Sequence, residues 1–264
     1  RAGRRMIALS HFTRLADRQG VDAKTIERDY VLTHIVAGIY RQPGSNDLAF
    51  KGGTVLRLCY FDDYRYSADL DFSLTGGRTP SAALELVVDA LEVARGAHDL
   101  PALELNDAGD RITYVGPLGR QHSLKLDLAA DELVEETTTT PLLARYPDQP
   151  ETDIVAYTLD EIAAEKLRCV IQRVQARDLY DLHQLFVSHR LDVDDIWPAF
   201  ERKAIHKSLD PDRFPDMFDK RMPAWEQRWD TEMEDHVAVG DRPQFNRVER
   251  TVRRALRSHL VGHR

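Results

Sequence analysis

The feature that most constrains the fold is a pair of aspartates one residue apart inside an apolar run. Residues 68–74 read Ala-Asp-Leu-Asp-Phe-Ser-Leu. Residues i and i+2 of a β-strand project from the same face, so this alternation predicts a strand with Asp69 and Asp71 on one face and Leu70 and Phe72 in a core. Aspartate is a poor strand former, so two aspartates within one strand suggest a functional role. Parallel carboxylates are hard oxygen ligands suited to Mg²⁺, while a pair of solvent-facing side chains is the plain alternative.

A glycine-rich turn precedes this strand. Gly52-Gly53-Thr54 follows a short strand predicted at 48–50 and opens a helix predicted over 54–60. Such a turn offers free backbone N–H groups to a phosphate. Together with the aspartate pair, it supplies the parts needed to hold a metal-bound triphosphate.

A third carboxylate lies on a later alternating segment. In 123–128 the leucines face one way and Lys125 and Asp127 the other. If this strand neighbours the aspartate pair, Asp127 would complete a set that could hold two metals, or one metal with a general base for an attacking hydroxyl. A polar outer face is the alternative.

Basic residues recur in the first helical segment after the predicted sheet. On one continuous helix, Lys166, Arg173 and Arg177 would share a face, which is typical of a triphosphate clamp. A break near residues 175–176 would instead make Asp178 an N-cap and Asp181 its partner in a capping box. Cations on a solvated face, balanced by nearby glutamates, are the remaining alternative.

Composition describes an ordinary globular protein. The chain has 264 residues, 42% hydrophobic and 30% charged, and no apolar run approaches the roughly 20 residues of a membrane helix. Cys59 and Cys169 lie in apolar helical patterns, so we expect buried thiols, no disulfide framework and a cytoplasmic protein.

Charge is distributed unevenly along the chain. The net charge of −8 argues against general coating of nucleic acid. Arginines are nevertheless concentrated at the two ends, where they could guide a polyanion or simply form the solvated faces of terminal helices. They are Arg1, Arg4, Arg5, Arg14, Arg18, Arg242, Arg247, Arg250, Arg253, Arg254 and Arg257.

The order of predicted elements indicates an α+β protein. Two helices, the first ended by Gly20 and the second capped by Asp22, precede a mixed sheet that contains one long helix over 81–97, and helices follow from 159. Three strands at 103–105, 111–115 and 121–128 should form a meander, with a loop or edge strand at 137–146. The predicted domains are N-terminal helices packing on the core (1–45), a core (46–158) and a helical C-terminal domain (159–264).

These motifs, taken in order, resemble the AbiEii/AbiGii-type nucleotidyltransferase toxins, which include the MenT toxins of mycobacteria. The resemblance runs from about Ile26 to Leu185 and rests on five segments. Arg28 stands where that family usually has Lys, and Thr54 fills the usual Ser position. The segments are Ile26–Thr33, Gly52-Gly53-Thr54, Arg65–Asp71, Lys125–Asp127 and Glu165–Leu167 with Arg177–Leu182.

The resemblance implies a DNA-polymerase-β-like nucleotidyltransferase core that transfers a nucleotide from an NTP and releases pyrophosphate. Mg²⁺, with Mn²⁺ as an alternative, would be the metal, and the partners would be NTP, tRNA or another RNA, and a cognate antitoxin. The expected function is a toxin that adds a nucleotide to an RNA, in particular the 3′ end of tRNA, and so blocks translation. A small-molecule or protein hydroxyl as acceptor, or a catalytically silent nucleotide-binding module, are the alternatives.

The predicted site residues fall into three overlapping groups. The metal ligands are Asp69, Asp71 and Asp127. The catalytic residues are Asp69, Asp71, Asp127, Lys166 and Asp178. The nucleotide-binding residues are Gly52, Gly53, Thr54, Ser67, Lys166, Arg173, Arg177 and Asp181.

Overall fold

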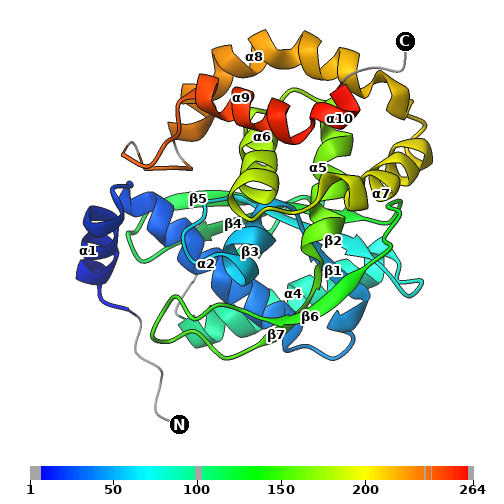
Figure 1. Cartoon of the computed structure of the whole chain (residues 1–264). Coiled ribbons are helices and arrows are strands. Elements are labelled where there is room, and N and C mark those ends of the chain that lie inside the picture. Colours follow the sequence, from blue (N-terminus) through cyan, green and yellow to red (C-terminus); the bar gives the residue numbers. More distant parts are fainter. Residues whose placement is uncertain (1–6, 99–102, 235, 239, 261–264) are drawn as a thin grey trace. The chain divides into compact units, whose positions relative to one another are not determined.

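The computed structural model describes residues 7–98, 103–234, 236–238 and 240–260, which form two compact units (Figure 1). Arg1, Arg4 and Arg5, three of the basic residues noted above, lie outside the described residues. The first unit, called the sheet unit, comprises Arg1–Asp131 and Thr137–Tyr157. The second, called the helical unit, comprises Glu132–Glu136 and Thr158–Arg264.

Local sequence signals set the limits of the helices in the sheet unit. Gly20 ends α1 in the left-handed conformation, with φ of 63°, and the Asp22 side chain accepts a hydrogen bond from the Lys24 N–H to cap α2, as predicted. The helices of this unit are α1 (Leu9–Gln19), α2 (Ala23–Tyr40), η1 (Ser45–Asp47), α3 (Gly52–Val55), the π-helical η2 (Leu56–Tyr60) and α4 (Pro80–His98).

Seven strands of the described residues form one mixed sheet in the order β3-β4-β5-β2-β1-β7-β6. The pairs β2–β5 and β1–β7 are parallel and the other pairs are antiparallel. The predicted meander and the edge strand are therefore confirmed. The strands are β1 (Leu48–Lys51), β2 (Asp69–Leu74), β3 (Glu104–Leu105), β4 (Arg111–Val115), β5 (Gln121–Ala129), β6 (Thr137–Pro141) and β7 (Asp153–Tyr157).

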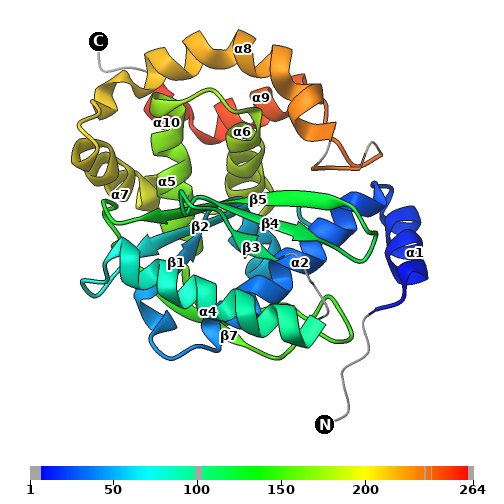
Figure 2. The ribbon, with the colours of Figure 1, turned by 180° about the vertical axis from the view of Figure 1, so that it is seen from behind.

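The core of the sheet unit lies between the sheet and the helices α2 and α4, which pack against each other on one face (Figure 2). Leu70 and Phe72 of β2 are fully buried there, and the Phe72 ring stacks on Phe50 of β1 with centroids 5.0 Å apart. The predicted alternation along β2 is confirmed, because Asp69 and Asp71 are only half-buried. Apolar burial on one face thus fixes which face carries the carboxylates.

The helical unit has an aromatic core. Phe200, Phe214, Phe218 and Trp225 are fully buried, and their rings contact one another edge to face or stacked. Its helices are α5 (Leu159–Gln172), α6 (Ala176–Leu182), the π-helical η3 (His183–Ser188), α7 (Val193–His206), η4 (Pro211–Arg213), α8 (Phe214–Glu234), α9 (Phe245–Ala255) and α10 (Arg257–Leu260). The predicted α+β fold is confirmed.

The cysteines behave as predicted. Cys59 and Cys169 are both free and buried, and burial raises the pKa of the Cys169 thiol to about 11. Neither thiol is therefore a nucleophile at neutral pH. Among the described helices, none combines the length and apolar character needed to span a bilayer.

Candidate active site

Three aspartates occupy neighbouring positions on adjacent strands of the sheet unit. β2 and β5 run in parallel with Asp69 opposite Lys125 and Asp71 opposite Asp127. Residues that face each other across a sheet project from the same side, and neighbouring strands lie about 4.8 Å apart. The condition stated for Asp127, that its strand should neighbour the aspartate pair, is met. Asp127 is exposed, whereas the leucines at 124 and 126 are buried.

A lysine extends this row on the other side. Lys51, the last residue of β1, pairs with Asp71, so that Lys51, Asp71 and Asp127 lie side by side on three consecutive strands. Only 4% of Lys51 is exposed, and its ammonium lies 6.0 Å from the centre of the Tyr157 ring. A buried lysine thus occupies the strand position next to Asp71, on the side away from Asp127.

The glycine turn is built against the same carboxylates. Gly52 has φ of 79°, and a Cβ at this position would lie 2.6 Å from Asp71 Oδ2. A Cβ on Gly53 would collide with the guanidinium of Arg65, which is itself buried. Gly52 is favoured by its left-handed backbone, and a side chain at Gly53 would have to displace the Arg65 guanidinium.

Thr54 links this turn to β2. Its hydroxyl donates a hydrogen bond of 2.5 Å to the carbonyl oxygen of Asp69, and the side chain is almost fully buried. In this arrangement the hydroxyl fixes the turn against the strand. Ser67, the other predicted hydroxyl, is also buried, in the segment that leads into β2.

The donor set is suited to a hard divalent cation. Asp69, Asp71 and Asp127 offer carboxylate oxygens from two hydrogen-bonded strands, which is the chemistry that Mg²⁺ and Mn²⁺ take. Within the described residues, no three His, Cys, Asp or Glu side chains already converge as a ligand cluster. Like charges repel one another when no cation lies between them, so the carboxylates would have to turn toward a bound ion.

The predicted basic stripe of the helical unit is wrong in its geometry. α5 ends at Gln172, Arg173 has an extended backbone, and α6 begins at Ala176. Lys166, Arg173 and Arg177 therefore do not lie on one continuous helix. The alternative was partly right: the chain does break there, but Gln175 is the N-cap residue, and neither Asp178 nor Asp181 caps the helix.

Asp178 and Asp181 instead form a buried ion cluster with Lys166. The Lys166 ammonium lies 2.9 Å from Asp178 Oδ1 and 2.7 Å from Asp181 Oδ2, and Arg173 donates two hydrogen bonds to Asp178. All but Arg173 are at least nine-tenths buried. Burial by itself raises the pKa of Asp178, but the charges and hydrogen bonds of Lys166 and Arg173 outweigh it and hold the pKa below its usual value.

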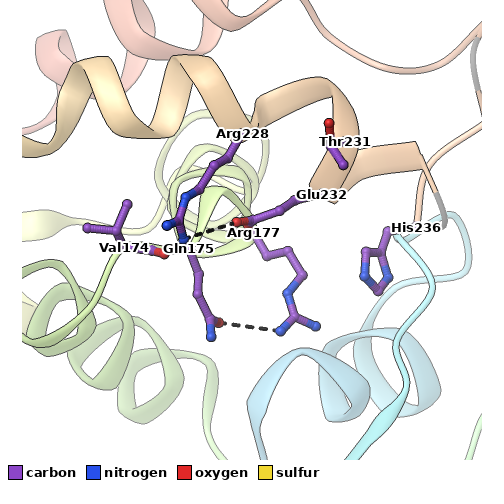
Figure 3. A pocket seen from close by; sticks show the side chains of 7 residues that line it. All are labelled: Val174, Gln175, Arg177, Arg228, Thr231, Glu232 and His236. Carbon is purple, nitrogen blue, oxygen red and sulfur yellow. Dashed lines mark hydrogen bonds and ion pairs between the residues drawn. The ribbon is translucent and has the colours of Figure 1, made fainter.

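Arg177 belongs to a different feature, a polar pocket of about 380 Å³ within the helical unit (Figure 3). α6 contributes Arg177, and α8 contributes Arg228 and Glu232. Glu232 accepts a hydrogen bond from the Ala176 N–H and lies 3.8 Å from Arg228. The described lining residues thus include two arginines, the cations best matched to phosphate oxygens, and one glutamate. It is lined by Val174, Gln175, Arg177, Arg228, Thr231, Glu232 and His236.

Sequence reasoning missed several of these residues. Lys51 adjoins the glycine turn, and a lysine inside an apolar strand was a signal that could have identified it. No sequence pattern identifies Arg65, because only the folded chain shows that its guanidinium lies beside Gly53. Arg228 and Glu232 are remote in sequence, and only the packing of α8 against α6 brings them beside Arg177.

Comparison with known proteins places the chain in a family. Residues 34–253 match the family described as "Nucleotidyl transferase AbiEii toxin, Type IV TA system". The chain belongs to the AbiEii nucleotidyl transferase toxin family. The resemblance noted in the sequence is therefore confirmed. No relative was found among curated proteins.

Solved structures share the fold of this AbiEii family member. MenT4, a nucleotidyltransferase toxin from Mycobacterium tuberculosis H37Rv, is 21% identical, with a TM-score of 0.61 over 96% of this chain and 99% of that chain. A putative nucleotidyltransferase from H. pylori is 16% identical, with a TM-score of 0.56 over 91% and 96%. JHP933 from Helicobacter pylori is also 16% identical, with a TM-score of 0.55 over 91% and 93%. At these identities the likeness concerns the fold.

Proposed function

We propose that this chain is a metal-dependent nucleotidyltransferase that transfers a nucleotide from an NTP to an RNA hydroxyl, at the 3′ end of tRNA, and thereby blocks translation. The observation that carries the proposal is the row of Asp69, Asp71 and Asp127 on two parallel strands, next to a glycine turn whose Gly52 has a left-handed backbone. As a member of a toxin–antitoxin family, the chain would be inhibited by a cognate antitoxin.

In the proposed reaction the acceptor hydroxyl oxygen attacks the α-phosphorus of the NTP. The new P–O bond forms as the bond from the α-phosphorus to the bridging oxygen breaks, and pyrophosphate leaves with that electron pair. Asp127 would accept the hydroxyl proton, or else serve as a further metal ligand. Asp69 and Asp71 would hold Mg²⁺ or Mn²⁺, which when bound supplies positive charge to the phosphate oxygens.

The remaining residues would position the nucleotide. Gly52, Gly53, Thr54 and Ser67 would shape the backbone beside the phosphates, with the Thr54 hydroxyl acting through its bond to the Asp69 carbonyl. The pocket beside Arg177 would hold a phosphate oxygen.

The ion cluster would contribute to the same task. We assign the Lys166 cluster, with Arg173, Asp178 and Asp181, a share in neutralising triphosphate charge. Because its formal charges sum to zero, that share would be smaller than the share of Arg177.

The test is incubation of the purified chain with each α-labelled NTP, Mg²⁺ and total tRNA. Asp69→Ala should abolish incorporation, whereas Asp89→Ala, a matched change at an exposed aspartate of α4, should leave it intact. If Asp69→Ala labels tRNA as well as the parent does, the site assignment is wrong. A small labelled product with unlabelled tRNA would indicate a small-molecule acceptor, a labelled polypeptide would indicate a protein acceptor, and tight NTP binding without turnover would indicate a silent module.

A further inference from the structure

One helix of the helical unit carries a row of arginines that the proposed catalysis does not use. On α9, Arg247, Arg250 and Arg254 follow one another at intervals of three and four residues, so they share a face. Arg257, at the start of α10, continues the spacing by three. All four are exposed. They are called the arginine row below.

The opposite side of α9 fixes this row in place. Phe245, Val248 and Val252 are buried, and the ring of Phe245 lies edge to face with Trp229 of α8 at 5.6 Å. α9 also packs against α6 and η3. Figures 1 and 2 show α9 next to α8 and close to one end of α6. The arginines therefore stand on a packed helix, so little backbone conformational freedom is lost when they bind a ligand.

Acidic side chains do not neutralise the row. Between Arg242 and Leu260 the one acidic residue is Glu249. Glu249 and Asp219 of α8 both form ion pairs with Arg253, which is not part of the row. Asp194 of α7, which also reaches this segment, is bound by His259. The side chains of the arginine row make no ion pair or hydrogen bond with any other residue that the structure describes.

This arrangement is unusual for a solvated helix face. The chain as a whole carries a net charge of −8, yet three residues that directly adjoin these arginines in the sequence are neutral: Asn246, Thr251 and Ser258. Four unpaired guanidinium groups in a row repel one another, which costs stability unless an anion binds them. Arginine is also the cation best matched to phosphate oxygens.

We propose that the arginine row is a docking track for the phosphate backbone of the RNA acceptor. On α9 itself, Arg247 to Arg254 spans seven residues, or about 10 Å of helix at 1.5 Å per residue, which is about the length of three phosphates in one base-paired strand. The track neutralises phosphates without reading sequence, so it contributes affinity and orientation. This inference rests on the proposed function for the identity of RNA as acceptor.

Salt dependence gives the expected magnitude. Binding constants fall with salt with a slope of about −0.7 to −0.9 per neutralised phosphate, so removing three contacts should reduce the slope by about 2–3. At 0.1 M salt the same change weakens binding by about a hundredfold.

The experiment measures binding of total tRNA to full-length protein by filter retention at several salt concentrations, with no NTP present. The variant replaces Arg247, Arg250 and Arg254 by Gln. The control replaces three exposed cations on other elements, Arg41, Arg213 and Lys220, with the same loss of charge. The arginine-row variant should lose about a hundredfold in affinity and the control less than threefold, and circular dichroism should show both folded.

Three outcomes would overturn the inference. Equal weakening in the two variants would mean that net charge alone matters, and unchanged binding in the arginine-row variant would mean that the track lies elsewhere. Competition by polyglutamate as strong as that by tRNA would identify an acidic polypeptide as the ligand. Transfer to tRNA is measured separately. If the arginine-row variant keeps both binding and transfer, the track is refuted and the proposed function stands. If binding depends on the arginine row but the parent transfers no nucleotide to tRNA, the track stands and the proposed function is refuted.

Discussion

Replacing Lys166 with methionine should destabilise the helical unit strongly, whatever it does to activity. The change removes an ammonium that lies within 3 Å of Asp178 and Asp181, two carboxylates that are 1% and 0% exposed. Asp178 keeps Arg173, but Asp181 loses the cation 2.7 Å away. Removing one partner of a buried pair costs about 3–5 kcal/mol, because the remaining charge stays desolvated.

Tryptophan fluorescence during urea unfolding reports the loss of stability of the helical unit. All three tryptophans, Trp197, Trp225 and Trp229, belong to the helical unit. With a slope of about 2 kcal/mol per molar urea, a loss of about 4 kcal/mol lowers the midpoint by about 2 M. Lys220→Met, at an exposed lysine of α8, should change stability by less than about 0.5 kcal/mol.

A second substitution separates charge from packing. Adding Asp181→Asn to Lys166→Met removes the carboxylate charge that the lysine faced, so the double variant should be more stable than the sum of the single effects by about 0.5–3 kcal/mol. If Lys166→Met lies within about 1 kcal/mol of the parent, or if the two changes add without coupling, the cluster does not stabilise the unit as described. Loss of activity in a Lys166 variant is therefore evidence about catalysis only when folding has been measured.

Three further outcomes are expected. Gly52→Ala and Gly77→Ala both strain a left-handed backbone, so each should lower the free energy of unfolding in urea by about 1 kcal/mol or more. Only Gly52→Ala should lose nucleotide transfer, because only its Cβ meets Asp71. Equal transfer activity of the two variants would contradict this geometry. The lowered pKa of Asp178 stabilises the folded state above the unfolded-state pKa of about 3.9, and this stability is lost as the pH falls below that value. Asp178→Asn should therefore be less stable than the parent at neutral pH, and its free energy of unfolding should fall less on acidification. The same dependence of stability on acid pH in the variant and the parent would refute this. Burial and, after it, the charge of Arg247 lower the pKa of His183, so Arg247→Gln should raise that pKa in an NMR titration and Asp89→Asn should not; no rise would place Arg247 away from His183.

Much of the sheet unit could be predicted because its signals are local. Strict alternation placed Asp69, Asp71 and Asp127 on a polar face, and the leucine and phenylalanine residues between them required the other face to be buried. The sequence could not show that β2 and β5 are neighbours in the sheet, so the role of Asp127 had to depend on that pairing. It joins segments more than fifty residues apart, and no local pattern encodes such a pairing.

The break between α5 and α6 could not be predicted because its cause is tertiary. No proline or glycine lies between Gln172 and Ala176. Instead, α8 supplies the partners for the open backbone groups: Arg221 donates to the carbonyls of Ile171 and Arg173, and Arg228 donates to that of Val174. A helix can end where it does because a distant helix satisfies its last carbonyls.

The same cause explains the error about the basic stripe. Helical periodicity placed Lys166, Arg173 and Arg177 together by assuming that the helix continued. Once the chain turns at Arg173, Lys166 is buried against Asp178 and Asp181, and Arg177 joins residues of α8 around a pocket. Periodicity located the charged residues but could not tell which carboxylates would meet them.

The central claim is that the carboxylate row on β2 and β5 transfers the α-phosphoryl group of an NTP with its nucleoside. The most direct measurement compares α-labelled and γ-labelled NTP with the same tRNA, Mg²⁺ and enzyme, for the parent, Asp71→Asn and Asp89→Asn. We expect the parent and Asp89→Asn to fix the α-label in tRNA and to release the γ-label as pyrophosphate, and we expect Asp71→Asn to do neither. Fixation of the γ-label, or undiminished transfer by Asp71→Asn, would contradict the central claim.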